Sequence, residues 1–169
     1  MADMLYDGTV LTWTGKGKFK ATSGMPGHQT PADQCLPEAG PVPEGLYRVP
    51  LIKGTSARDD GAGICRLEPS WRVESIPRGA EAGACEPYWA NWGHNRVRIE
   101  PANAATRTTC SPARSGFYLH DSTKGYSHGC IEVDTTFFGV LRSAMKQGTK
   151  VLTLQIKYKP GSTNGGTKK

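Results

Sequence analysis

The sequence predicts a single, mostly β domain, a sandwich or barrel of short strands with one helix after Cys130. Three observations lead to this prediction. Gly (21) and Pro (12) are abundant among the 169 residues, long apolar runs are absent, and short alternating segments are separated by turn-forming residues. A chain of this length can bury a core of its own. We therefore expect one domain over residues 1–159.

The N-terminal quarter predicts three strands and a loop. Residues 4–13 carry Asp7-Gly8 between apolar residues, and Asp-Gly suits the positive φ of a tight hairpin turn. Residues 18–22 alternate polar and apolar side chains, as a third strand does. Residues 24–45 are dense in Gly and Pro, which indicates a loop, and it leads into a strand over 46–49.

The middle of the chain is the least regular part. Residues 53–87 show weak periodicity around one strand-like run at 71–76, with Cys65 and Cys85 on either side. Loops of this length are uncommon unless they are functional or tethered, and a disulfide would tether this one. We interpret residues 51–95 as a lid or rim insertion beside the functional site.

Regular elements return in the last part of the chain. Strands are expected over 96–99, 116–119 and 151–156. Between the last two, Asp134 or Thr135 can cap a helix that ends at Gly148. Its apolar residues fall at helical spacing: Phe137, Phe138, Leu141, Ala144 and Met145. The polar, Gly-rich residues 160–169 predict a disordered basic tail.

The chemistry is concentrated in residues 117–131, where His120 and Cys130 lie ten residues apart. A thiolate is a good nucleophile only when a neighbour lowers its pKa or takes its proton, and an imidazole can do both. Gly129 lets the backbone turn tightly, and successive N–H groups in such a turn can face a developing oxyanion. The pattern predicts a cysteine nucleophile on a Gly turn, with its base a short loop upstream.

Residues 127–131, Ser-His-Gly-Cys-Ile with His120 before them, resemble the core motif of the L,D-transpeptidase family, a Ser/Thr-His-Gly-Cys-hydrophobic run. The resemblance implies a mostly β catalytic domain that acts on bacterial peptidoglycan. In it Cys130 would attack a stem-peptide carbonyl beside diaminopimelate, and His120 would be the base. Ser127 and His128 would support the site, and backbone amides of the same turn would hold the oxyanion.

Two features depart from the general motif. His120 is closer to Cys130, and Glu132-Val133 stands where the family often has Arg and then Asn a little further on. The short loop is similar to a compact branch of this fold found among type VI secretion effectors. That branch has a hairpin, a Ser-Gly turn and a Gly-Pro-x-Pro-x-Gly-x-Tyr segment, and this sequence has them in that order at 4–13, 22–24 and 40–47. The resemblance implies an antibacterial toxin that trims stem peptides or exchanges their terminal D-amino acid.

Several neighbouring residues have two interpretations. Asp121 either orients an imidazole, as the third member of a triad does, or starts a turn. Tyr118 either lines a groove or packs. Tyr88 and Trp89 are candidates for a substrate wall near the insertion, whereas Trp92 is expected to pack in the core.

A metal site is not expected. His120, His128 and Cys130 are possible zinc ligands, but the sequence has no Cys-x-x-Cys or His-Glu-x-x-His pattern to complete the site. Zinc would also quench the thiolate as a nucleophile. We therefore predict no metal and no cofactor.

The other four cysteines bear on location. Cys35, Cys65, Cys85 and Cys110 are either buried thiols or two disulfides in one of three connectivities. Disulfides persist in oxidising compartments. The N-terminus lacks the basic start and apolar core of a signal peptide. We expect a protein made in the cytoplasm, secreted by a route that reads no N-terminal signal, and active in the periplasm of a target cell.

The expected partners follow from the same reasoning. They are diaminopimelate-type stem peptides, a cognate immunity protein and components of a secretion apparatus. The net charge of +6 is scattered without a nucleic-acid-binding motif, and no stretch is long enough to span a bilayer. Two enzyme alternatives stay open, a housekeeping L,D-transpeptidase and a peptidoglycan cysteine endopeptidase or amidase. A third is a non-enzymatic, disulfide-stapled envelope-binding module in which Cys130 pairs with another cysteine.

Overall fold

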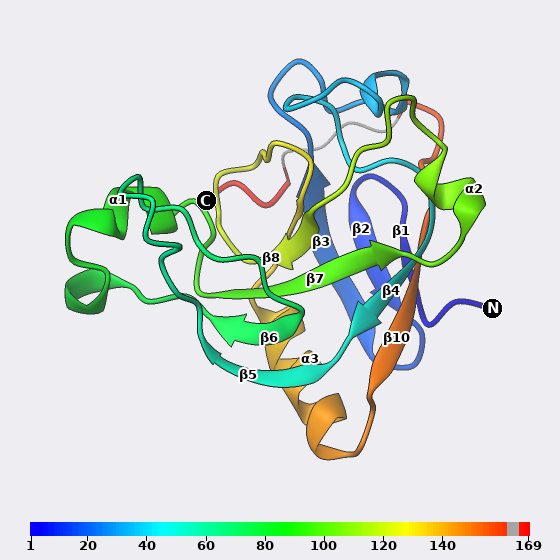
Figure 1. Cartoon of the computed structure of the whole chain (residues 1–169). Helices are drawn as coiled ribbons and strands as arrows, with labels where there is room; N and C mark the ends of the chain where they lie inside the picture. Colours follow the sequence, from blue (N-terminus) through cyan, green and yellow to red (C-terminus); the bar gives the residue numbers. More distant parts are fainter. Residues whose placement is uncertain (162–165) are drawn as a thin grey trace.

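The computed structural model describes residues 1–161 and 166–169. Its strands are β1 Met4–Tyr6, β2 Val10–Trp13, β3 Gly17–Ser23, β4 Gly45–Pro50, β5 Ile52–Ser56, β6 Arg72–Ser75, β7 Asn95–Pro101, β8 Phe117–His120, β9 Ile131–Val133 and β10 Val151–Ile156. Its helices are α1 Glu86–Trp89, α2 Ala104–Arg107 and α3 Thr136–Lys146, with short 3-10 turns at Pro31–Asp33, Gly79–Glu81 and Gly83–Cys85. Within these residues eight strands close into a barrel, in the order β4-β10-β1-β2-β3-β9-β8-β7 with β7 pairing back to β4 (Figure 1). The mostly β prediction is confirmed.

The N-terminal hairpin and the third strand form as predicted. β1 pairs antiparallel with β2, and β2 pairs antiparallel with β3. The hairpin turn is closed by Asp7, whose carboxylate accepts hydrogen bonds from the Thr9 and Val10 amides at 3.0 and 2.9 Å. β1 also runs parallel to β10, so the first and last strands of the chain lie side by side.

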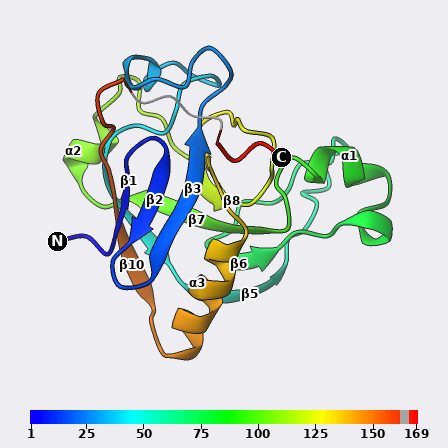
Figure 2. The ribbon, with the colours of Figure 1, turned by 180° about the vertical axis from the view of Figure 1, so that it is seen from behind.

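The core fills the barrel and extends under α3 (Figure 2). The predicted helix is confirmed, and its apolar face is buried through Phe137, Phe138, Leu141 and Ala144. Phe137 meets the rings of Trp13 and Phe19 from the first hairpin and β3. The first turn is held by Asp134, whose carboxylate accepts a hydrogen bond from the Thr136 amide at 3.0 Å.

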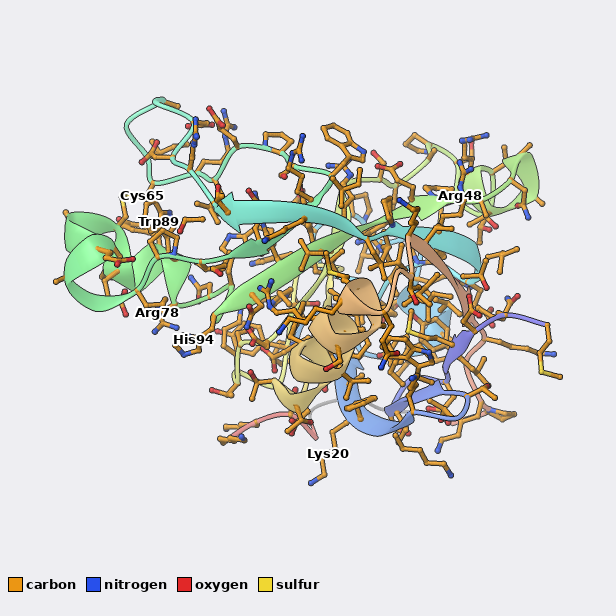
Figure 3. All side chains as sticks on the ribbon, turned by 90° about the horizontal axis from the view of Figure 1, so that it is seen from below. Lys20, Arg48, Cys65, Arg78, Trp89 and His94 are labelled. Carbon is orange, nitrogen blue, oxygen red and sulfur yellow. A yellow bond between two sulfur atoms is a disulfide. The ribbon has the colours of Figure 1, made fainter. Side chains whose placement is uncertain are left out.

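Residues 51–95 extend the sheet and then leave the barrel. β6 pairs with β7, and β5 runs parallel to β6. Beyond them the chain forms a lobe around α1 that projects from the side of the barrel (Figure 1). The lobe has a small core of its own, made of Ala57, Leu67, Ile76, Ala82 and Trp89. Cys65 and Trp89 lie together on this lobe (Figure 3), where the Trp89 indole donates a hydrogen bond to the Cys65 carbonyl at 2.8 Å.

The C-terminal residues return to the barrel beside the loop that precedes β9 (Figures 1 and 2). Within the predicted tail, residues 162–165 lie outside the described residues. Thr167 is buried and its hydroxyl donates to the Glu132 carboxylate, while the Lys169 amide donates to the Thr123 carbonyl at 3.1 Å. In the described part of the chain, none of the helices has the length and apolar character needed to cross a membrane.

Candidate active site

The register of β8 and β9 separates the core from the chemistry. The two strands are parallel, with Leu119 opposite Ile131 and His120 opposite Glu132. Leu119 and Ile131 belong to the barrel core. Because side chains alternate along a strand, His120 and Glu132 lie on the opposite face of the sheet. Arg96 pairs with His120 from β7 and adds a cation to that face.

Cys130 ends the Gly turn immediately before β9 and is half-buried. The Tyr118 amide donates a hydrogen bond to its Sγ at 3.4 Å. Desolvation raises the pKa of the Cys130 thiol above its ordinary value, and the Tyr118 hydrogen bond lowers it by less. At neutral pH the group is therefore a thiol, so a base must remove its proton before it can act as a nucleophile.

The other four cysteines form two disulfides. Cys35 is bonded to Cys110, and Cys65 is bonded to Cys85. This settles which of the three connectivities forms, and it leaves Cys130 free. The alternative in which Cys130 joins a disulfide is therefore wrong. Two disulfides are compatible with an extracellular or periplasmic protein.

The hydrogen bonds of His120 fix which of its nitrogens carries a proton. Nδ1 lies 3.1 Å from the Trp92 carbonyl oxygen and 3.2 Å from Ser122 Oγ. Ser122 donates its only proton to the Glu132 carboxylate, so toward His120 it can only accept, as the carbonyl does. Nδ1 is therefore the protonated nitrogen, and the lone pair resides on Nε2.

His120 is also held in its neutral form. Only 3% of the residue is exposed, and desolvation, together with the positive charge of Lys124, lowers its pKa to about 3. The imidazole is neutral at any physiological pH. The pair is thus a thiol with a neutral base, rather than a preformed thiolate with an imidazolium.

Cys130 lies where two hollows meet. The larger one, about 480 Å³, extends toward the 24–45 loop and the segment before β8. The smaller one, about 190 Å³, is lined by Asn91, Trp92, His120, Lys124, Ser127, His128 and Cys130. His120 and Cys130 share this smaller hollow, whereas Trp92, His128 and Cys130 line both. A substrate can therefore extend to either side of the sulfur.

The Gly turn is fixed by side chains from distant parts of the chain. Ser127 donates its proton to the Cys130 carbonyl and accepts from the Gly24 and Gly129 amides at 3.2 and 3.3 Å. Gly129 has a φ of 135°, and a Cβ there would lie 2.6 Å from the Arg114 guanidinium. Both the backbone conformation and the space therefore require glycine.

Arg114 joins the two loops that border the larger hollow. Its guanidinium donates to the carbonyls of Gln34, Pro41 and Gly40 at 2.6, 2.8 and 3.2 Å, and to the His128 carbonyl at 3.2 Å. The Cys35–Cys110 disulfide ties the same loop to the segment that leads to Arg114. Arg114 thus holds the Gly turn against the 24–45 loop.

A buried arginine, Arg96, packs against the aromatic side chains next to His120. Arg96 is 1% exposed and forms an ion pair with Glu74 at 2.9 Å. Its guanidinium lies 4.8 Å from the Trp92 ring centroid and 4.6 Å from that of Tyr118. Trp92 in turn packs edge-on against His120, with ring centroids 5.4 Å apart. Arg96 therefore orders the aromatic side chains that surround the base.

Asp121 does not orient the imidazole. Its carboxylate accepts hydrogen bonds from the amides of His94 and Asn95 at 2.6 and 2.8 Å and from the Thr135 hydroxyl at 2.7 Å. These contacts brace the start of β7 against the start of α3. The Trp92 carbonyl contacts Nδ1 of His120 instead, and the sequence did not indicate this contact because any residue type supplies a carbonyl.

The aromatic residues proposed from the sequence to line the site differ in where the structure places them. Tyr88 is exposed and Trp89 is in the core of the lobe, and neither lines the hollows at Cys130. Trp92, expected in the core, lines both hollows. Tyr118 packs under Arg96, and its backbone amide is the part that contacts Cys130. Trp92 follows α1 and is partly buried against the same small core as Trp89, so it packs as expected and lines the hollows as well.

The structure therefore brings together a free thiol, a neutral imidazole of defined tautomer and a constrained Gly turn at the junction of two hollows. A scan against protein-family models finds no match for this chain, and a search of curated proteins finds no similar sequence. Function is accordingly inferred from the residues of this site and from the motif at 127–131.

Proposed function

We propose that the chain is a cysteine acyl-transfer enzyme that acts on peptidoglycan stem peptides, as an L,D-carboxypeptidase, an L,D-transpeptidase that exchanges the terminal D-amino acid, or both. One observation carries the acyl-transfer chemistry. The Trp92 carbonyl holds Nδ1 of His120, which leaves the Nε2 lone pair available for the proton of Cys130 in the same hollow. The motif at 127–131 supports stem peptides as the substrate.

In the first step Cys130 Sγ attacks the carbonyl carbon of the diaminopimelate residue. The S–H proton passes to Nε2 of His120, the C–S bond forms, and the carbonyl π electrons move to the oxygen. The Gly129 amide already donates to Ser127, so the oxyanion is assigned to the amides of His128 and Cys130. The C–N bond then breaks, the terminal D-amino acid leaves with the proton from His120, and a thioester remains.

The group that resolves the thioester decides the product. Each nucleophile gives its proton to His120, attacks the thioester carbonyl and expels the Cys130 sulfur, which recovers that proton. Water yields a trimmed tripeptide, a free D-amino acid yields an exchanged tetrapeptide, and a stem amine yields a cross-link. Trimming and exchange both remove the donors that a cell needs for cross-linking.

The proposed setting is the periplasm of a target bacterium, reached by type VI secretion, where the protein acts as an antibacterial toxin. The resemblance to the compact effector branch supports this setting, and the two disulfides fit an oxidising compartment. A producing cell would then need a cognate immunity protein, which would have to cover the hollows at Cys130.

The proposal is tested by mass spectrometry of muropeptides. Diaminopimelate-type peptidoglycan is incubated with the protein, with and without a D-amino acid such as D-methionine, and with protein alkylated at Cys130. We expect tripeptides, or tetrapeptides ending in D-methionine, only with the unmodified thiol. Cleavage at internal stem bonds would instead identify an endopeptidase or amidase, and unchanged muropeptides would contradict the proposed substrate.

The protonation states predict an unusual pH profile. The active pair needs neutral His120, which protonates only as the pH falls through about 3, and protonated Cys130, which ionises only as the pH rises above its raised pKa. Both forms coexist across the neutral range. We expect kcat/KM for a stem tetrapeptide to stay flat between about pH 5 and pH 8. An inflection near the ordinary histidine pKa of about 6.5 would show that the pair works as thiolate and imidazolium instead.

A further inference from the structure

Three cations face the site, and they differ in how their hydrogen-bond donors are used. Arg96 is paired with Glu74 and also donates to the Glu68 carbonyl. Arg114 donates to four backbone carbonyls. Both guanidinium groups are thereby committed to holding the protein together.

Lys124 is different. Its side chain is half-buried and lines the smaller hollow together with His120 and Cys130. Its ammonium lies over the Tyr126 ring, 4.8 Å from the centroid. Among the described residues, no carboxylate is within ion-pair distance of it. The nearby Glu132 carboxylate accepts from Ser122, Thr167 and the backbone amides of residues 124 and 125, and its charge acts on Lys124 only at longer range. A desolvated ammonium with unused donors favours an anionic partner.

The position of His120 determines which part of a bound substrate would lie next to Lys124. His120 must give its proton to the departing nitrogen, so the leaving residue occupies the hollow that His120 lines. In a terminal α-amino acid, a single carbon separates that nitrogen from the free carboxylate. A nitrogen at His120 therefore brings the carboxylate into the same small hollow as the Lys124 ammonium.

We propose that Lys124 binds the free carboxylate of the leaving residue, and that this contact restricts the enzyme to stem peptides that end one residue beyond the scissile bond. This inference rests on the proposed function and names the substrate class of the same site. The volumes agree with it, since the hollow of about 190 Å³ is the smaller one and the longer acyl part of the stem has about 480 Å³ on the other side of Cys130.

The same contact accounts for exchange. An incoming free D-amino acid approaches the thioester by the reverse of the path by which the first one left. Its amine lies at His120 and its carboxylate at Lys124. An amine without an adjacent carboxylate lacks this contact, so Lys124 would favour free D-amino acids over other amines as acceptors.

The first test compares a tetrapeptide that has a free terminal carboxylate with the same peptide as its C-terminal amide. We expect the unmodified protein to favour the acid by about 10- to 100-fold in kcat/KM, since a desolvated charge pair of this kind is worth one to two factors of ten. Lys124→Met should remove that preference, because it lowers turnover of the acid far more than turnover of the amide. Lys157→Met changes an exposed lysine that directly follows β10 and lines neither hollow at Cys130, and it is the matched control.

The second test does not depend on peptide turnover. Cys130 is alkylated with iodoacetate, which is anionic, and with iodoacetamide, which is neutral and of similar size. We expect Lys124→Met to slow the reaction with iodoacetate about tenfold more than the reaction with iodoacetamide, because the lost charge acts on the thiol in both reactions but on the reagent only in the first.

The two tests separate the possible failures. A charge preference in alkylation without any turnover of stem peptides would overturn the proposed function and keep the anion site. Turnover of acid and amide at equal rates, or alkylation rates that Lys124→Met changes equally for both reagents, would overturn the role of Lys124 alone.

Discussion

Cys130→Ala and His120→Gln are each expected to lower kcat/KM for stem tetrapeptides by a factor on the order of 10⁴ or more. The first removes the nucleophile. The second keeps a side chain of similar size near the Trp92 carbonyl but removes the imidazole that is proposed to take the thiol proton. Because burial raises the pKa of the Cys130 thiol, little thiolate forms at neutral pH without a base. The measurement is release of the terminal D-amino acid over time.

The double variant distinguishes a working pair from two separate contributions. If Cys130 and His120 act as one unit, the double variant is no slower than the slower single variant, since either loss already removes the step. Multiplied losses would contradict this. Circular dichroism of each variant checks that the fold is kept. Full activity in Cys130→Ala would exclude the proposed chemistry altogether.

Arg96→Met is expected to destabilise the protein by about 3–5 kcal/mol, because it leaves the Glu74 carboxylate buried without its partner. For a chain of this size that loss lowers Tm by roughly 10 °C. The stacking of Trp92 and Tyr118 on the guanidinium is lost as well, so the surroundings of His120 loosen. Thermal and denaturant unfolding measure the change.

Two further variants separate burial from charge. In Arg96→Met/Glu74→Met no charge is left unpaired, so most of the lost stability is expected to return. Arg66→Met breaks an ion pair whose arginine is 68% exposed, and its expected cost is under about 1 kcal/mol. Equal losses in the Arg66 and Arg96 variants would show that the buried pair contributes no more than a surface one.

Most of the barrel could be predicted because its strands carry local signals. The Asp7-Gly8 turn, the alternation at 96–99 and the helical spacing after Asp134 all reappear as elements of the structure. β5 and β9 were missed for different reasons. β5 is largely exposed and includes Gly54, whereas β9 has three consecutive buried residues and so lacks alternation.

Only the parts of the site that depend on residue type and spacing could be predicted from the sequence. The spacing of His120 and Cys130 indicated a pair, and the structure places both in one hollow. Arg96 and Lys124 gave no sign of their roles, since their surroundings arise from strand register and a loop conformation. The orientation of His120 depends on a backbone carbonyl, and no sequence pattern distinguishes one carbonyl from another.

The alternation along β8 and β9 also has a consequence for how this protein can change. Neighbouring residues of these strands lie on different faces of the sheet. Leu119 and Ile131 fill the barrel, whereas His120 and Glu132 lie on the opposite face. Every residue of β8 and β9 is buried, however, so a substitution on the outward face changes both the surroundings of Cys130 and the stability of the fold. Exposed positions of the loop between the two strands, such as Thr123, can vary at less cost to folding, so sequence change between β8 and β9 is expected there first.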